Sequence, residues 1–210
     1  MRIAGAGVGD LKLVLATSNS GKQREFDALL APLGVTVVLQ SELGVDSLAE
    51  TGTSFEANAL LKAKHAARIT GLSALADDSG LEVDALGGRP GVWSARFAGE
   101  SATDEQNNAL LLQELAGVTQ DKRAARYCCV LALVFDTGKR APLIATGNWK
   151  GRIAMAPSGR GGFGYDPLFI PEGQRVSAAE LPAQMKNALS HRGKALVSLV
   201  KQLRIAAQKP

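Results

Sequence analysis

The first forty residues alternate between two patterns of apolar and polar positions. Residues 11–16 (LKLVLA) form a short apolar run that is typical of a buried strand. In residues 23–33 the apolar side chains recur every three or four positions, which predicts an amphipathic helix that Gly34 ends. Residues 35–40 predict a second strand. The order strand, polar loop, helix, strand indicates an α/β fold.

The rest of the chain continues this alternation. Thr53 and Glu56 have the spacing of a capping box, which predicts a helix that runs to about Thr70 and ends at Gly71. The other predicted elements are a strand at 73–76, a helix at 103–116 capped by Thr103, two antiparallel strands at 125–136 and 141–149 with a turn at Thr137 and Gly138, and a helix at 192–206. No repeat or linker interrupts residues 11–210, so a single domain is expected there, preceded by a loose extension at residues 1–10.

Composition places the chain among globular proteins with a real core, because 46% of its 210 residues are hydrophobic and 21% are charged. No apolar run approaches the roughly 18 residues that span a bilayer, and no signal peptide is recognisable. The two cysteines, Cys128 and Cys129, are adjacent on a predicted strand and point to opposite faces, so a disulfide between them is not expected. These features predict a cytoplasmic protein without membrane contact. A net charge of +4 fits an anionic ligand but does not identify it.

A polar loop joins the first predicted strand to the first predicted helix. Backbone N–H groups and the helix dipole at such a junction favour an anion, and Lys22 adds a positive charge. A phosphate would be well held there, although a polar turn that only caps the helix explains the same residues. The candidate phosphate-binding residues are Thr17, Ser18, Asn19, Ser20, Gly21 and Lys22.

Three acidic residues, Glu50, Asp77 and Asp78, are candidates for a metal site. Two adjacent aspartates at the end of a predicted strand repel each other unless a cation or solvent relieves the repulsion. Mg²⁺ prefers one or two carboxylates together with water and substrate phosphates, and a carboxylate beside it can take a proton from water. A solvated acidic turn is the alternative interpretation.

Two further features carry candidate binding residues. Asn58, Lys62 and His65 share one face of the helix after Thr53, where Lys62 could reach the phosphate loop and a solvated face is expected for the other two. Residues 159–166 (GRGGFGYD) contain four glycines, which let backbone approach a ligand closely, and Phe163 could stack on a base.

Basic residues cluster just before the last predicted helix, at Lys186, His191 and Arg192. A 6-oxo purine presents a hydrogen-bond acceptor where adenine presents a donor, so cationic donors would favour the 6-oxo purine. Taken alone, these residues are explained better by an N-cap at Ser190 followed by a basic surface.

Six motifs occur in register, and together they are far more specific than any one alone. Over about residues 11–204 the sequence resembles the inosine triphosphate pyrophosphatase family, which hydrolyses noncanonical purine nucleoside triphosphates. The motifs that carry the resemblance are LATSNSGK at 15–22, ETGTSFEANA at 50–59, ADDSGL at 76–81, GVWSAR at 91–96, GGFGYDP at 161–167 and SHRG at 190–193. Ser18 departs from the pattern, since glycine is common at that position.

The resemblance implies an α/β fold with a long, mixed, twisted sheet flanked by helices, and two lobes with a nucleotide-binding cleft between them. It implies a homodimer that uses Mg²⁺ to cleave dITP, ITP and XTP to the monophosphate and pyrophosphate by water attack on the α-phosphorus. Asp78 would be the general base and, with Glu50, a metal ligand, while Lys62 would help the phosphate loop to hold the triphosphate. The other implied nucleotide contacts are Ser79, Phe163, Gly164, Tyr165, Asp166, Lys186, His191 and Arg192.

Three alternatives remain at this point. A pyrophosphatase of similar fold that acts on modified pyrimidines, as in the Maf-like proteins, is disfavoured by the Ser190-His191-Arg192 motif. A nucleotide- or RNA-binding module would use the lysines and Arg192 as a basic patch, but the carboxylates of Asp77, Asp78 and Glu50 would then repel phosphates. A purely structural α/β protein does not explain the glycine-rich loop. A small nucleotide is therefore the expected partner, rather than a stable complex with nucleic acid.

Overall fold

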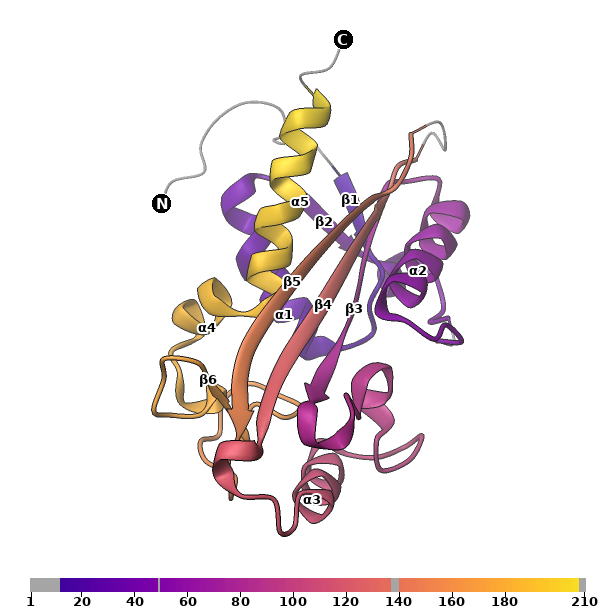
Figure 1. Cartoon of the computed structure of the whole chain (residues 1–210). Helices are drawn as coiled ribbons and strands as arrows, with labels where there is room; N and C mark the ends of the chain where they lie inside the picture. Colours follow the sequence, from indigo (N-terminus) through magenta and orange to yellow (C-terminus); the bar gives the residue numbers. More distant parts are fainter. Residues whose placement is uncertain (1–11, 49, 137–139, 208–210) are drawn as a thin grey trace. The chain divides into compact units, whose positions relative to one another are not determined.

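The computed structural model describes residues 12–48, 50–136 and 140–207. Its strands form a six-stranded sheet in the order β2-β1-β3-β4-β5-β6 (Figure 1). The strands are β1 (Lys12–Leu15), β2 (Thr36–Leu39), β3 (Ala74–Val83), β4 (Ala124–Val134), β5 (Leu143–Ile153) and β6 (Phe169–Pro171). The α-helices are α1 (Ser20–Leu30), α2 (Phe55–Thr70), α3 (Asp104–Glu114), α4 (Ala183–Leu189) and α5 (His191–Ala207), and short 3-10 helices connect several of these elements.

The sheet mixes parallel and antiparallel pairs. β1 lies parallel to both β2 and β3, whereas β5 and β6 are antiparallel. The parallel part follows from the strand–helix–strand order at the start of the chain, because a crossover helix returns the chain in the same direction. An open mixed sheet flanked by helices confirms the predicted α/β fold class.

The chain forms two compact units. Unit 1 contains the chain up to residue 78, residues 130–147 and the chain from residue 193, and unit 2 contains residues 79–129 and 148–192. The long strands β3, β4 and β5 therefore each contribute one part to each unit. The expected organisation as one two-lobed domain with a cleft stays a prediction, and the expected extension at residues 1–10 lies outside the described residues.

Unit 1 has a core made largely of small residues. Three alanines of α2, Ala59, Ala63 and Ala66, are fully buried and recur at helical spacing against Val14 of β1 and Ala76 of β3. Small side chains on that face let the helix axis lie close to the strands. Asn58 and Lys62 each precede one of these alanines, so the packing of the alanines places both residues close to the strands.

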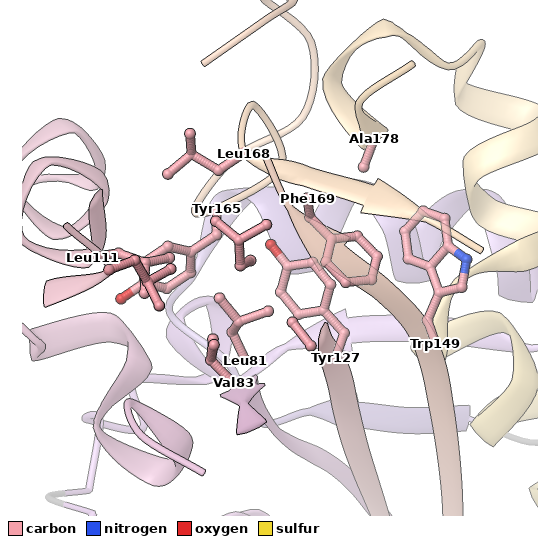
Figure 2. Packing of buried hydrophobic residues seen from close by; sticks show 12 residues of the cluster. Leu81, Val83, Leu111, Tyr127, Trp149, Tyr165, Leu168, Phe169 and Ala178 are labelled. Carbon is pink, nitrogen blue, oxygen red and sulfur yellow. The ribbon is translucent and has the colours of Figure 1, made fainter. Parts of the chain in front are cut away.

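Unit 2 has a larger, more aromatic core, which Figure 2 shows. The rings of Tyr127 and Phe169 meet edge to face with centroids 4.7 Å apart, a favourable geometry for aromatic pairs. Next to this core, Arg123 is almost fully buried, and its guanidinium donates to the carbonyls of Leu115, Val118 and Ala154 at 2.9, 3.0 and 3.1 Å. Arg123 therefore supplies hydrogen bonds to the carbonyls at the C-terminal end of α3 and connects them to Ala154, the residue that follows β5.

Helix ends agree with the sequence predictions at most positions. Gly34 ends the 3-10 helix Ala31–Leu33 that continues α1, and Gly71 ends α2, with φ values of 69° and 67°, a region that favours glycine. Thr103 caps α3 in a capping box with Gln106. The predicted cap of α2 at Thr53 is wrong. Ser54 is the N-cap, because its hydroxyl accepts the backbone N–H of Ala57 and the helix starts one residue later than expected.

Three elements differ from the sequence predictions. β3 is ten residues long, so Asp77 and Asp78 lie inside a strand and not in a turn at its end. The strand β6 and the helix α4 were not predicted, since both are short and lack a clear apolar period. β4 and β5 are neighbours in the sheet, as predicted, but the turn proposed at Thr137 and Gly138 lies outside the described residues.

Two expectations about the whole chain can be compared with the structure. Cys128 and Cys129 are both free thiols, as their adjacent positions on a strand predict. In the part of the chain that the structure describes, no helix has the length and apolarity required to cross a membrane.

Candidate active site

The predicted phosphate loop lies where β3 runs past the end of β1. Leu15, the last residue of β1, is in register with Leu75, and the N–H of Ala16 donates to the Leu75 carbonyl at 2.8 Å. β1 then stops while β3 continues through Asp77 and Asp78. The loop from Thr17 therefore leaves the sheet beside the two aspartates, at the carboxyl end of parallel strands, where α/β proteins commonly bind ligands.

The loop residues form a capped helix start. Asn19 caps α1 by accepting the Lys22 N–H at 3.0 Å, and the Thr17 hydroxyl accepts the Asn19 N–H at 3.2 Å. First-turn amides have no partner inside a helix, so this junction presents the donors expected for an anion. The Lys22 ammonium lies 2.7 Å from Asp77 Oδ1. Of the remaining candidates, Ser18 and Ser20 are exposed and Gly21 is buried. Phosphate binding by this loop stays a prediction.

Glu50, Lys62 and Asp78 form a second cluster, which we call the carboxylate–lysine group. The Lys62 ammonium donates to Glu50 Oε1 at 2.5 Å and to Asp78 Oδ1 at 2.9 Å. Asp78 is 4% exposed, so this contact lies away from bulk water. One cation is thus shared by two carboxylates that are 28 positions apart in the sequence.

Asn58 completes the surroundings of Asp78. Its side-chain amide donates to Asp78 Oδ2 at 3.2 Å, and its carbonyl oxygen accepts the Gly52 N–H at 2.7 Å. Asn58 is fully buried, so the solvated face expected for it is wrong. The error has a simple cause, because the polar partner that makes its burial favourable lies on another element. His65, one turn beyond Lys62, is partly buried.

Burial and charge shift the pKa values of this group in different directions. Burial raises the pKa of Asp78 to about 6, although Lys62 and Lys22 oppose the shift. Burial also acts to raise the pKa of Glu50, but the nearby Lys62 outweighs it and the net shift is downward. For Lys62, burial alone would lower the pKa, and the carboxylates of Asp78, Asp77 and Glu50 raise it. Of the two carboxyl groups, Asp78 is therefore the one whose pKa lies closer to neutral pH.

The carboxylate–lysine group fits a divalent metal ion that takes only one or two of its ligands from the protein. Glu50 and Asp78 each direct one oxygen at a single cation, the Lys62 ammonium, so a metal ion at that position would meet two carboxylates. Within the described ranges, no three His, Cys, Asp or Glu side chains are arranged to hold a metal by themselves. Mg²⁺ is usually bound by one or two carboxylates and takes its other ligands from water and phosphates.

The glycine-rich loop in unit 2 is held by Asp166. Its Oδ2 accepts the Phe163 N–H at 2.9 Å and the Lys186 ammonium at 2.6 Å. Gly162 has φ +74°, and a Cβ there would lie 2.1 Å from Asp166 Oδ2, so only glycine lets the loop close on this carboxylate. The ring of Phe163 lies 5.0 Å from the Lys186 ammonium. Phe163, Asp166 and Lys186, which sequence reasoning proposed separately, thus belong together.

His191 and Arg192 join the same cluster, which we call the aromatic–basic group. The His191 ring stacks on Tyr127 with centroids 4.7 Å apart and planes 7° apart. The Arg192 guanidinium lies 5.2 Å from the Phe163 ring and donates to the Ser79 hydroxyl at 2.8 Å. Lys186, Ser190, His191 and Arg192 are all buried, so the interpretation of these residues as a basic surface is wrong.

Two predicted contact residues have structural partners of their own. Tyr165 packs in the core of unit 2 (Figure 2). Its hydroxyl donates to the Ser94 carbonyl at 2.8 Å. Gly164 is held by α3, since its N–H donates to Asp104 Oδ2 at 2.6 Å and its carbonyl accepts the Asn108 amide at 2.8 Å. Tyr165 and Gly164 therefore support the loop, and their direct contact with a nucleotide stays a prediction.

Sequence reasoning missed four residues that shape these groups: Asn58 as a partner of Asp78, Tyr127 under His191, and Asp104 and Asn108 beside the glycine-rich loop. Asp104 and Asn108 are four positions apart on α3, so they share a face, which was the available signal. Nothing local to Tyr127 indicates that it faces His191.

Comparison with known proteins identifies the family. The Ham1 family model matches residues 13–202, nearly the whole described chain. The chain belongs to the Ham1 family. This result, together with the relatives described next, confirms the resemblance drawn from the six motifs.

The matched relatives have consistent names. The chain is 52% identical over 193 residues to the dITP/XTP pyrophosphatase of Shigella flexneri, covering 92% of this chain and 98% of the relative. It is 54% identical to the dITP/XTP pyrophosphatase of Methylococcus capsulatus, covering 92% and 96%. Among solved structures, a HAM1 protein from Coxiella burnetii aligns with a TM-score of 0.83 at 46% identity, covering 92% and 98%. A dITP/XTP pyrophosphatase from Mycobacterium abscessus aligns with a TM-score of 0.72 at 44% identity, covering 90% and 99%.

Proposed function

We propose that this Ham1-family chain hydrolyses noncanonical purine nucleoside triphosphates, such as dITP, ITP and XTP, to the monophosphate and pyrophosphate. The observation that carries the proposal is Asp78, a buried carboxyl group with a pKa raised to about 6, which shares the Lys62 ammonium with Glu50. A general base works best when its pKa lies near the working pH, and Asp78 meets that requirement while staying mostly ionised at pH 7. The names of the close relatives support the same reaction.

The triphosphate is assigned to unit 1. Lys22 and Lys62 both hold carboxylates in the described structure, and a bound triphosphate offers them a second set of anions. The first-turn amides of α1 and the side chains of Thr17, Ser18, Asn19 and Ser20 supply neutral donors beside them. If Lys62 moved to the phosphates, the Asp78 and Glu50 oxygens that it now contacts would become available to a metal ion.

Glu50 and Asp78 are proposed to hold Mg²⁺. The ion would supply charge neutralisation for the triphosphate and a lowered pKa for a water molecule. Asp78 orients a water molecule and accepts its proton, and the water oxygen attacks the α-phosphorus. The bond from the α-phosphorus to the bridging oxygen breaks, and pyrophosphate leaves with its negative charge held by Lys22 and the loop amides. No covalent intermediate is needed.

The purine is assigned to unit 2. Phe163 presents a ring for stacking, and the buried cations of Lys186 and Arg192 lie 5.0 and 5.2 Å from its centroid. His191, next to Arg192 in the chain, is buried as well. Oxygen at position 6 of hypoxanthine or xanthine accepts from such donors, whereas the amino group of adenine is itself a donor. Discrimination against adenine therefore rests on the cost of placing its amino donor against these buried donors.

The remaining expectations belong to the same proposal. The enzyme acts on small nucleotides in the cytoplasm, forms no stable complex with nucleic acid and assembles as a homodimer. Light scattering across a range of protein concentrations measures the mass in solution, and a monomer mass throughout would contradict the dimer.

A substrate panel tests the reaction. Purified protein is incubated with Mg²⁺ and, separately, dITP, XTP, dGTP, dATP and dTTP, and both products are identified. We expect monophosphate and pyrophosphate from dITP and XTP and little from the others. Orthophosphate as the product would indicate cleavage at the γ-phosphate and refute the mechanism. Preferential hydrolysis of dTTP would refute the base assignment while leaving the reaction type intact.

A further inference from the structure

Asn58 uses both ends of its side chain on the two segments that carry Glu50 and Asp78. It is fully buried at the start of α2, beside the alanines that pack this helix against the strands. Its amide nitrogen donates to Asp78 Oδ2 at 3.2 Å, and its oxygen accepts the Gly52 N–H at 2.7 Å. Gly52 is two residues after Glu50, so one side chain links the Glu50 segment to the strand that carries Asp78.

The contact with Gly52 leaves no room for a side chain. A Cβ on Gly52 would lie 2.5 Å from Asn58 Oδ1, closer than such atoms approach in proteins. The backbone after Glu50 is therefore brought against the Asn58 amide as closely as glycine permits. This close approach sets the distance between the backbone after Glu50 and helix α2.

The geometry points to Asn58 as a positioning residue for the carboxylate pair, an inference that rests on the proposed function. Asn58 orients the Asp78 carboxylate through Oδ2, so that the other oxygen, Oδ1, faces the same cation as Glu50 Oε1. It also holds the segment that brings Glu50 to that cation. The two side-chain bonds of Asn58 go to Asp78 and Gly52, and we assign it a role that acts through these two residues.

Asparagine suits this position because it donates at one end and accepts at the other. Leucine has a similar size but offers neither group, and aspartate would accept from Gly52 while repelling Asp78. A buried asparagine that serves stability alone would change the free energy of unfolding when replaced. A positioning residue changes, in addition, the affinity of the carboxylate pair for a metal ion, which makes the two roles separable.

The experiment measures Mn²⁺ binding directly, in wild type and in Asn58→Ala, Gly52→Ala and the double variant. The titration contains no pyrophosphate or nucleotide, because either would bind Mn²⁺ in free solution, and bound Mn²⁺ is followed by the loss of the free-ion electron paramagnetic resonance signal. We expect each single variant to weaken Mn²⁺ binding by about 10- to 100-fold, the usual effect of removing an outer partner of a metal ligand. Because both changes break the same link, the double variant should be little worse than either single variant.

Asn107→Ala is the matched control. Asn107 is also a buried asparagine on a helix, 3% exposed, and bonds the backbone of Ala95 and Ala98 in unit 2. It should lower thermal stability to a similar degree and leave Mn²⁺ affinity within about twofold of wild type, since it lies outside the proposed site. Steady-state rates with dITP should show the same separation, with a higher Mg²⁺ concentration for half-maximal rate in Asn58→Ala and little change in KM at saturating Mg²⁺.

The role of Asn58 and the proposed hydrolysis of dITP can fail independently of each other. Wild-type Mn²⁺ affinity in a folded Asn58→Ala variant would overturn the positioning role, even if the wild-type enzyme hydrolyses dITP as proposed. An equal loss of Mn²⁺ affinity in Asn107→Ala would overturn it as well, because a general loss of stability would then explain both. Absence of dITP hydrolysis by the wild type refutes the proposed function and leaves the Mn²⁺ comparison to be judged by itself.

Discussion

Replacing Asp78 with asparagine should stabilise the protein while removing its activity. The Asp78 carboxyl has a pKa of about 6 in the folded chain, against an ordinary value of 3.8, chiefly because it is buried. A carboxyl group whose pKa is raised on folding opposes the folded state once it is ionised. Asparagine has nearly the same shape and never ionises, so Asp78→Asn removes that opposition.

The size of the effect follows from the shift. The difference between 3.8 and about 6 corresponds to about 3 kcal/mol at neutral pH, at about 1.4 kcal/mol per pKa unit. One end of the new amide would face a donor, either Lys62 or Asn58, and this mismatch costs about 1 kcal/mol. The expected net gain in the free energy of unfolding is therefore about 2 kcal/mol at pH 7.5.

The pH dependence distinguishes this explanation from a general packing effect. The pKa of Asp78 is higher in the folded chain than in the unfolded chain, so ionising Asp78 lowers the free energy of unfolding. This loss is absent below the unfolded pKa of 3.8, grows between pH 3.8 and about 6, and is complete above about 6. The loss removed by Asp78→Asn should thus be large at pH 7.5 and nearly vanish at pH 4.

Urea unfolding of both proteins with a chelator present measures the difference at the two pH values. A variant less stable than wild type at pH 7.5, or a difference that does not change between pH 4 and pH 7.5, would refute the assignment of a raised pKa to Asp78. Turnover of dITP should fall by several orders of magnitude with nucleotide binding largely kept, and near-normal turnover would show that Asp78 is not the base.

Three further predictions concern other parts of the molecule. Phe163→Ala should lower kcat/KM for dITP by about 10- to 100-fold, since stacking on a base is worth about 1–3 kcal/mol; an unchanged kcat/KM in steady-state assays would remove Phe163 from the base site. Arg123→Met should lower the free energy of unfolding by about 3–5 kcal/mol because three carbonyls lose their donor, and a loss below about 1 kcal/mol in urea unfolding would show that water replaces it. The Mg²⁺ concentration for half-maximal rate should rise as the pH falls through about 6, because protonated Asp78 is a poor ligand, and a flat profile between pH 5 and 8 would contradict Asp78 as a ligand.

Local signals in the sequence predicted most of the secondary structure. Helix ends depend on backbone groups within a few residues, so they can be predicted without knowledge of the fold. Examples are the cap at Thr103 and the glycines Gly34 and Gly71. The cap at Thr53 was wrong by one residue, because Ser54 offers the same hydroxyl chemistry beside it. Such neighbouring alternatives are decided by the path of the preceding loop.

The sequence named most residues of the candidate site, but it did not show which of them contact one another. Asp77 and Asp78 were predicted just after a strand that stops at residue 76, yet β3 carries both, with Lys22 and Lys62 beside them. The cations that make this possible come from α1 and α2, which no pattern around residues 77 and 78 indicates.

Sequence alone determined the α/β class, the strand–loop–helix junction at residues 17–22 and, through six motifs in register, the family. Only the tertiary structure decided which polar residues are buried. Asn58 and Asp78 are 20 positions apart, and Arg192 and Ser79 are 113 apart. A polar side chain is buried when a partner satisfies it, and a partner that distant is brought into reach only when the chain has folded.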